Sequence, residues 1–368
     1  MMNIKVEKKM LANAVNNVLK AVPGKTTMAI LNNILISAVG NEIVFVGNDL
    51  ELGISSSVEG EIVEQGKTTI DARLFSEIVR KLPDGEVSLS VDEKGTATVK
   101  CGKSKFSLAT MDADDFPLPP FVEEMAQITL SEFTLRESVN QTIFCANLAE
   151  VNNKMMAALY FEVKGSVLRV TALDGHRIGI RNIELAEEYP DIKAIMPGKT
   201  MAELAKIITG GIDDKVTLLF GKNHVVFRFG NTVVTSRLIE GNYFGVDKLI
   251  GGDTPIHFMA NRKDLIATID RTLTLVAGEN RPVIFDKKGK NLSLSIKTAR
   301  GEMTEEMEIE TSGDDIRIAF NPKFVIDTLK AVEDEKVDFY LASNMAPAFV
   351  KNEKGEYLYL ILPVNIRE

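Results

Sequence analysis

The sequence has little of the chemistry on which secreted and membrane proteins depend. It contains two cysteines, Cys101 and Cys145, which are too few for a disulfide framework and are expected to be buried thiols. No apolar run is long enough to cross a membrane, and the first residues contain no apolar stretch typical of a signal peptide. We therefore expect a globular protein of the cytoplasm with no membrane partner.

The motifs of common active sites are also missing. The three histidines show no spacing that suits a metal, and no Gly-x-Ser-x-Gly elbow occurs. Four Gly-Lys-Ser/Thr tripeptides begin at residues 24, 66, 102 and 198. None has the second glycine, five residues earlier, that a phosphate-binding loop needs, so we interpret all four as turns. We expect no cofactor and no metal site.

One cluster, Asp174-Gly175-His176-Arg177, resembles catalytic chemistry. An aspartate two residues from a histidine could orient the imidazole as a general base, which keeps a hydrolase using Asp174 and His176 as an alternative. No nucleophile motif accompanies the pair, and Asp-Gly is a frequent hairpin turn. The pattern favours a turn that lines a surface pocket.

What the chain does contain is a threefold internal repeat. A helix-like segment that starts at Arg73 returns 126 residues later at Lys199, and it returns again after a further 124 residues at Lys323. A strand-like segment that starts at Ile43 returns 125 residues later at Leu168, and it returns again after a further 124 residues at Leu292. Two elements with one period indicate a triplicated domain, and a period of this length indicates complete globular units. Three similar units suggest that the shape of the chain, more than one catalytic pocket, serves its function.

Each unit is expected to combine two amphipathic helices with a meander of short strands. Apolar residues recur with a 3.6-residue period in the helices and a two-residue period in the strands. Few helices and many strands predict an α+β fold rather than a wound βαβ fold. We place the three domains at 1–122, 123–250 and 251–368, joined by rigid segments at 115–120 and 251–255.

Charge is distributed unevenly between the predicted helices and the remainder. The net charge of −9 argues against a general nucleic-acid binder. The six predicted helices nevertheless carry fourteen Lys and Arg against eight Asp and Glu, a net +6 that leaves −15 elsewhere. They are 7–20, 73–81, 131–144, 199–208, 262–275 and 322–330. Basic helices on an acidic body suit a protein that holds a polyanion on one face. Alternatively, Lys and Arg collect there because they favour helices.

Two segments of opposite charge suggest a contact between chains. The stretch 100–108 is expected to be a basic strand with apolar residues between its lysines, and the stretch 302–310 is acidic with the same alternation. Complementary edges favour head-to-tail association, although charge also protects solvated edge strands from aggregation. The candidate residues are Lys100, Lys103, Lys105, Phe106, Leu108, Glu302, Glu305, Glu306 and Glu308.

Across its whole length the sequence resembles the bacterial sliding clamps, the beta subunit of DNA polymerase III. The resemblance rests on motifs in matching order, among them Gly47-Asn-Asp-Leu-Glu51, Asp115-Phe-Pro117, Val170-Thr-Ala-Leu-Asp-Gly-His-Arg177, Thr235-Ser-Arg-Leu-Ile-Glu-Gly241 and Leu362-Pro-Val364. No single motif is decisive, but their combination with a triplicated domain is highly specific.

The resemblance implies a head-to-tail homodimer that forms a ring, with helices inside and antiparallel sheets outside. The ring would encircle duplex DNA without reading its sequence and tether the polymerase, so the chain would not be an enzyme. Implied partners are the catalytic subunit of DNA polymerase III, the clamp loader and other proteins that carry the clamp-binding motif. Leu275 joins the implied dimer contact. A scaffold with no DNA role remains the third hypothesis.

The resemblance also implies a pocket for an apolar partner peptide between the second and third domains. Its matching positions are Met156, Leu173, Gly175, His176, Arg177, Ile178, Lys248, Leu249, Asn321, Phe324, Met345, Pro347, Leu360, Ile361, Leu362, Pro363 and Val364. Leu173, Phe244 and Asn365 depart from the family pattern, which puts the peptide preference of the pocket in question.

For DNA, the resemblance selects positions at which the family is also basic. They are Lys25 in a loop and Arg73, Arg80, Lys199 and Lys206 on predicted helices. Each contact is expected to contribute little alone and to weaken as the salt concentration rises.

Overall fold

The computed structural model describes residues 2–150, 152–276 and 281–366. The chain divides into two compact units, Met1–Leu135 with Lys206–Leu238, and Arg136–Ala205 with Ile239–Glu368. The middle repeat therefore contributes to both units. No helix within the described ranges is long and apolar enough to cross a bilayer.

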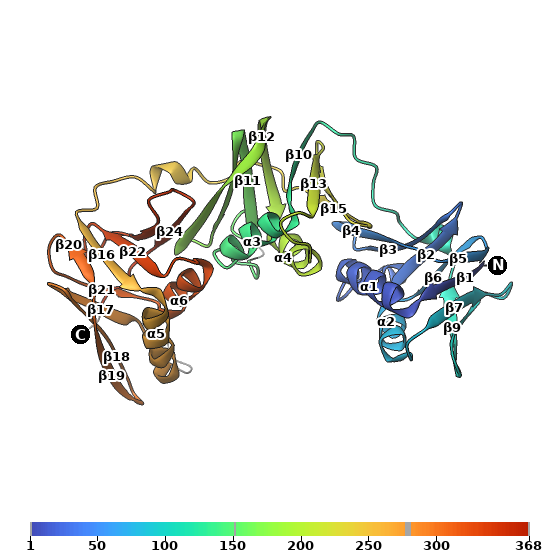
Figure 1. Cartoon of the computed structure of the whole chain (residues 1–368), viewed down its shortest axis with the longest axis horizontal. Helices are drawn as coiled ribbons and strands as arrows, with labels where there is room; N and C mark the ends of the chain where they lie inside the picture. The colour runs from blue at the N-terminus through green and yellow to red at the C-terminus, as the bar shows by residue number, and fades with distance from the viewer. Residues whose placement is uncertain (1, 151, 277–280, 367–368) are drawn as a thin grey trace. The chain divides into compact units, whose positions relative to one another are not determined.

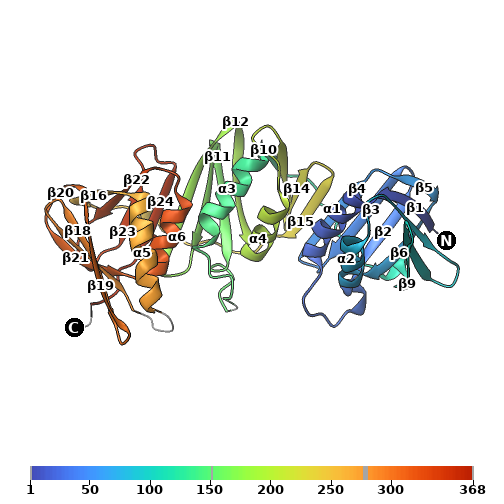
Figure 2. The same cartoon turned by 60° about the horizontal axis from the view of Figure 1, so that its bottom comes forward.

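All six predicted helices are present, and each end agrees within two residues. They are α1 (Lys8–Val18), α2 (Ala72–Lys81), α3 (Glu132–Ile143), α4 (Gly198–Ile207), α5 (Arg262–Val276) and α6 (Pro322–Ala331). In α2, residues three and four apart point toward the core, and the Asp71 carboxylate accepts the Leu74 N–H at 2.8 Å. In each of the views of Figures 1 and 2, α1 lies beside α2 and α5 beside α6.

The first unit contains one sheet of thirteen strands, in the order β10-β13-β14-β15-β4-β3-β2-β6-β9-β8-β7-β1-β5. From the first repeat come β1 (Met2–Glu7), β2 (Asn33–Val39), β3 (Glu42–Asn48), β4 (Leu52–Val58), β5 (Glu61–Glu64), β6 (Gly66–Asp71), β7 (Glu86–Val91), β8 (Thr96–Cys101) and β9 (Ser104–Met111). From the second come β10 (Ala126–Ser131), β13 (Lys215–Phe220), β14 (His224–Phe229) and β15 (Thr232–Arg237).

The second unit contains two sheets. The seven-stranded sheet has the order β11-β12-β24-β23-β22-β16-β20, and the four-stranded sheet has the order β19-β18-β17-β21. The strands are β11 (Ala158–Leu173), β12 (Arg177–Pro197), β16 (Ile256–Asn261), β17 (Val283–Lys288), β18 (Asn291–Thr298), β19 (Gly301–Glu308), β20 (Glu310–Ser312), β21 (Ile316–Phe320), β22 (Lys336–Leu341), β23 (Ala348–Lys351) and β24 (Tyr357–Ile361).

Neighbouring repeats are joined by main-chain pairing. In the first unit, β15 of the second repeat pairs antiparallel with β4 of the first, with Val234 opposite Ile54. In the second unit, β24 of the third repeat pairs antiparallel with β12 of the second, with Tyr359 opposite Gly179. The three strands β4, β12 and β19 start at Leu52, Arg177 and Gly301, one repeat apart. Both junctions therefore use equivalent strands.

The proline-rich segment 115–120, which its composition predicts to be a rigid linker, also packs onto the first repeat. Phe116 is buried among residues of the first repeat that include Ile30 and Val46. The Pro117 carbonyl accepts a hydrogen bond from the Asn48 amide at 2.7 Å. The first half of this segment thus packs onto the first repeat, and the strand pair β15–β4 supplies the junction.

Two expectations about local structure were wrong. The basic stretch 100–108 is not one strand, because Gly102 takes a positive φ of 55° and turns β8 back into β9. Two of the four Gly-Lys tripeptides are not turns, since Gly66 begins β6 and Gly198 begins α4, whereas Gly24 lies in a loop and Gly102 and Lys103 form the turn before β9. Both cysteines are free and buried, as expected.

Candidate functional site

The residues assigned to a partner pocket meet in the second unit where β12 pairs with β24. Ile178 lies opposite Leu360, and Arg177 lies opposite Ile361. Directly opposed side chains share one face of a sheet, and successive side chains of a strand alternate between faces. The pair Ile178–Leu360 and the pair Arg177–Ile361 therefore lie on opposite faces, and the assigned residues form two groups.

The first group is an apolar cluster. Its buried members are Leu173, Ile178, Ile180, Val246, Phe349 and Leu360, and the partly buried Met156, Tyr243, Phe244, Ile250, Tyr340 and Leu358 pack against them. Sequence reasoning missed Ile180, which the two-residue period from Ile178 could have revealed. It also missed Phe349, for which no local signal exists, because its strand is placed only by long-range pairing.

Exposed apolar side chains lie close to this cluster along the chain. Leu249 is 55% exposed and follows Val246, and Met345 is 73% exposed and precedes Phe349. Leu362 and Val364 are also exposed, and the Leu362 N–H donates to the His176 carbonyl at 2.9 Å. A buried apolar floor with exposed apolar neighbours is chemistry suited to an apolar peptide.

The remaining assigned residues occupy varied positions. Lys248 and Asn365 are exposed, and Pro347 and Pro363 are half-buried. Ile361 is 1% exposed and lies on the face of the sheet opposite Leu360. The end of the C-terminal tail that departs from the family pattern, residues 367–368, lies outside the described residues.

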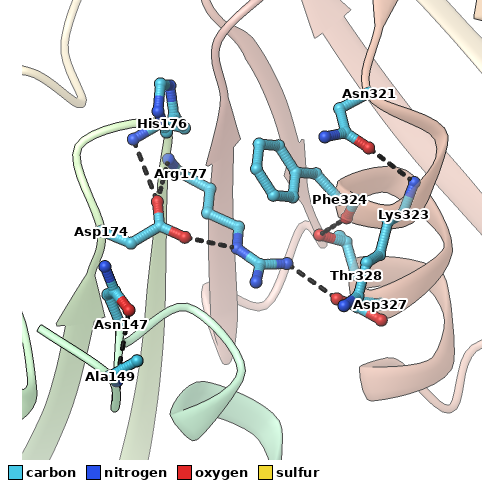
Figure 3. A network of polar contacts seen from close by, with 10 residues as sticks. All are labelled: Asn147, Ala149, Asp174, His176, Arg177, Asn321, Lys323, Phe324, Asp327 and Thr328. Atoms are coloured by element: carbon cyan, nitrogen blue, oxygen red, sulfur yellow. Dashed lines mark hydrogen bonds and ion pairs between the residues drawn. The ribbon is translucent and has the colours of Figure 1, made fainter. Parts of the chain in front are cut away.

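The second group is a polar network centred on Arg177 (Figure 3). Its Nε donates to Asp174 Oδ2 at 3.0 Å, and its Nη1 donates to Asp327 Oδ2 of α6 at 2.9 Å. The guanidinium carbon lies 4.5 Å from the centre of the Phe324 ring, on which the His176 ring stacks at 5.9 Å. Arg177, which is 8% exposed, therefore connects the β11–β12 turn to α6 through two carboxylates and an aromatic face.

The same contacts determine what the Asp174-Gly175-His176-Arg177 cluster is. Asp174 Oδ1 accepts the backbone N–H groups of His176 and Arg177 at 3.0 and 3.1 Å, and Gly175 takes a positive φ of 85°. This is a turn stabilised by its own aspartate. The described hydrogen bonds of Asp174 go to main chain and guanidinium, not to the imidazole that a hydrolase would need it to orient. Among all the residues that the structure describes, no group of three His, Cys, Asp or Glu is arranged to hold a metal.

The segment after β15 is anchored to β11 beside the apolar cluster. Tyr243 stacks on Tyr160 with ring centres 4.9 Å apart, and Arg169 Nη1 donates to Asp247 Oδ1 at 2.7 Å. Burial raises the pKa of the Tyr243 phenol well above its usual range, so the group stays neutral. These contacts hold Val246 against Ile178 and its neighbours.

Asn321 and Cys145 have structural roles near the network. The Asn321 Oδ1 accepts the Lys323 N–H at 3.0 Å and caps α6, which has Pro322 in its first turn. Burial raises the pKa of the Cys145 thiol far above its usual range. A Cβ on Gly179 would approach Cys145 Sγ to 2.8 Å, so glycine is required there.

Basic residues recur at one spacing on three equivalent helices. Arg73 and Arg80 of α2 correspond to Lys199 and Lys206 of α4, and each pair is seven residues apart on one helix face. The side chains of all four are exposed. Sequence reasoning missed the third pair, Lys323 and Lys330 of α6, although the repeat period locates it; both are exposed. Lys25 is exposed in its loop.

The acidic segment and most of the basic segment lie on sheet edges, although Lys100 lies on β8, which pairs with both β7 and β9. Residues 104–109 of β9 pair only with β8, and β19 pairs only with β18 among the described strands. Phe106 and the lysines at 100, 103 and 105 are exposed, and Leu108 is half-buried. Leu275 of α5 lies beside the start of β19, 3.9 Å from the position of a Cβ on Gly301. Both edges present main-chain groups free to pair with another strand.

The four glutamates of β19 do not share one role. Glu302, Glu306 and Glu308 are exposed on one side of the strand. Glu305 points the other way, where it accepts hydrogen bonds from Arg271 Nε and Thr268 Oγ1 of α5, both at 2.9 Å. The hydrogen bond from Arg271 lowers the pKa of the Glu305 carboxyl. Glu305 is thus engaged within its own chain.

Comparison with known proteins connects these features to one family. Family models of the DNA polymerase III beta subunit match the chain in three parts: the N-terminal domain over residues 2–120, the central domain over 129–244 and the C-terminal domain over 248–365. The beta sliding clamp of Staphylococcus epidermidis is 32% identical over an alignment of 376 positions that covers 99% of each of the two chains.

Solved structures agree over the full length. A crystal structure described as a DNA polymerase III beta subunit of Eubacterium rectale is 44% identical, covers 100% of both chains and superposes with a TM-score of 0.96. The DNA polymerase sliding clamp of Bacillus subtilis is 29% identical with the same coverage and a TM-score of 0.95. The chain contains three tandem clamp domains and belongs to the family of the DNA polymerase III beta subunit, the bacterial sliding clamps.

Proposed function

We propose that this chain is a non-catalytic processivity factor of DNA replication, and that two copies close head to tail around duplex DNA. The observation that carries the proposal is the way in which the repeats join. Strand β15 pairs with β4, and β24 pairs with β12. The equivalent strands that remain are β9 of the first repeat, whose residues 104–109 pair on one side only, and β19 of the third, which has a free edge among the described strands.

A second copy completes the series. In our proposal β9 of one chain pairs antiparallel with β19 of the other, so that the junction used twice within the chain is used again between chains. A heterologous contact of this kind forms a closed ring if the rotation per chain closes. The lysines at 100, 103 and 105 then face the exposed glutamates of β19, which fixes the orientation of the strands.

The basic helix faces supply the attraction to DNA. Three helices carry the same pair of exposed cations, at positions 73 and 80, 199 and 206, and 323 and 330. We propose that these pairs and Lys25 face the phosphate backbone. Phosphate contacts carry no sequence information, so a ring held by them binds any duplex and slides along it.

We also propose that the apolar cluster and its exposed neighbours capture short apolar peptides of partner proteins. Candidate partners are the catalytic subunit of DNA polymerase III, the clamp loader and other proteins with a similar peptide. A polymerase bound to an encircling ring rebinds DNA at high effective concentration, which is the basis of processivity. We place the domain boundaries near residues 122 and 250, and the site of action in the cytoplasm.

Retention on circular DNA tests the proposal. Chains loaded onto a nicked circular plasmid should co-elute with it through a sizing column, and cutting the plasmid once should release them. A topological link is lost at free ends, whereas ordinary binding is indifferent to them. Equal retention before and after cutting would contradict encirclement, and no retention on circles would favour a scaffold without a DNA role.

The helix pairs should set the salt dependence of DNA binding. Changing Arg73, Arg80, Lys199, Lys206, Lys323 and Lys330 to Gln should weaken binding, because it removes contacts with phosphate. Each lost contact should also reduce the steepness of log K against log salt by about 0.9. The control changes six exposed lysines outside the helices, namely Lys94, Lys164, Lys193, Lys222, Lys290 and Lys354, to Gln. Fluorescence anisotropy with a short duplex measures both slopes. Equal slopes in the two variants would show that charge alone, and not its position, controls binding.

A further inference from the structure

One face of the seven-stranded sheet carries an unbroken row of side chains across six strands. Leu173 lies opposite Ile178, Ile178 opposite Leu360, Leu360 opposite Phe349, Phe349 opposite Tyr340, and Tyr340 opposite His257. Directly opposed residues share a face, so the row is continuous. It begins in the apolar cluster, reaches Tyr340 on β22 at the edge of that cluster, and ends at His257 on β16, beyond every position that the family resemblance assigned to partner binding.

The far end of the row is polar. Lys351 Nζ lies 4.7 Å from the centre of the Tyr340 ring, and the centre of the His257 ring lies 4.8 Å from the centre of the same tyrosine ring. Asp338 Oδ1 is engaged by His257 Nε2 at 2.7 Å. Among the described residues Lys351 has no carboxylate partner, and its ammonium rests on the Tyr340 ring. We call His257, Asp338, Tyr340 and Lys351 the Tyr340 patch.

We propose that the Tyr340 patch extends the peptide surface and binds an acidic side chain that flanks the apolar segment of a partner peptide. The inference rests on the proposed peptide-binding function. A partly buried ammonium on an aromatic ring pairs well with one carboxylate. The carboxylates of Asp338 and Glu353, which both act on Tyr340, oppose a strongly anionic ligand such as duplex DNA or phosphate and leave room for one carboxylate beside Lys351. The occupant is therefore a partner aspartate or glutamate.

The strand spacing gives the position of this residue in the peptide. Strands β24 and β22 are two steps apart, which is roughly 10 Å at a strand spacing of roughly 4.8 Å. An extended peptide advances roughly 3.3 Å per residue. The acidic residue should thus lie about three residues from the apolar residue that contacts Leu360.

Peptide binding to the full chain tests the extension. Fluorescein-labelled peptides with an apolar core of Leu and Phe residues carry Asp or Gln at one to five positions from either end of the core. In the wild-type protein, Asp should improve binding over Gln by about threefold to fivefold at the three-residue spacing, as expected for a partly exposed ion pair. Lys351→Met should abolish this gain and leave the affinity for the Gln peptide unchanged.

The controls separate the two proposals. Lys354→Met removes the same charge from an exposed turn nearby and should keep the gain. Lys351→Glu should reverse the preference, so that a peptide with Lys at that position binds better than one with Asp. An Asp gain that persists in Lys351→Met, or that is absent from the wild type, overturns the extension alone. A core peptide that fails to bind the wild type overturns the peptide surface itself and the extension with it.

Discussion

Reversing the charge of either sheet edge should convert the chain into a monomer, and mixing the two reversed variants should restore a dimer. The first variant changes Lys100, Lys103 and Lys105 to Glu, and the second changes Glu302, Glu306 and Glu308 to Lys. In each variant alone, both contacts of the ring place like charges together, which costs several kcal/mol. In a mixed dimer, one contact has two reversed edges and the other has two native edges, so both are attractive.

Light scattering coupled to size exclusion measures this result directly. Each variant should have the 40.5 kDa mass of one chain, and the equimolar mixture should have twice that mass. Glu305 is left unchanged because Arg271 and Thr268 already bind it within the chain. A dimer formed by either variant alone would show that these edges are not the contact. Retention on nicked circles by the mixture only would connect the contact to encirclement.

Arg177→Met should destabilise the second unit by about 3 kcal/mol or more. The side chains of Arg177 and Asp174 are 9% and 12% exposed, and that of Asp327 is 25% exposed. Met fills most of the volume of the arginine stem, but it leaves two poorly solvated carboxylates without their cation. Breaking such a pair costs more than the pair itself contributes, because the remaining charge stays buried.

Urea unfolding followed by far-ultraviolet circular dichroism measures the loss, since the chain has no tryptophan to report fluorescence. Arg271→Met removes an arginine from an exposed pair with Glu305 and should have a much smaller effect. Adding Asp327→Asn to Arg177→Met should recover part of the stability, because it removes one unpaired charge. A loss no larger than that of Arg271→Met would show that the network does not stabilise the unit.

The sequence predicted local elements well because their signals are local. The apolar spacing of Phe75, Ile78 and Val79 is enough to define a helix face, and Asp71 provides its start. The tripeptide at Gly102 was correctly interpreted as a turn, but the stretch 100–108 was nevertheless expected to be one strand, because basic and apolar residues continue on both sides of the glycine. A pattern of alternation identifies strands but not a reversal between them.

Features that depend on long-range pairing were beyond the sequence. Phe349 and Tyr340 join the apolar cluster only because β23 lies between β24 and β22. The ion pair of Arg177 joins it to Asp327, 150 residues away. The assigned positions of the peptide surface came from family resemblance, which supplied Leu360 and Ile361 together, whereas the strand register places them on opposite faces.

The junctions between repeats consist of backbone ladders, and this has an evolutionary consequence. A hydrogen bond between main-chain amides is indifferent to the side chains that flank it, so substitutions can accumulate at β15–β4 and β24–β12 as long as strand geometry persists. Relatives can then drift far apart in sequence while the architecture is inherited intact. The Bacillus subtilis protein, at 29% identity and a TM-score of 0.95, illustrates how far such divergence extends.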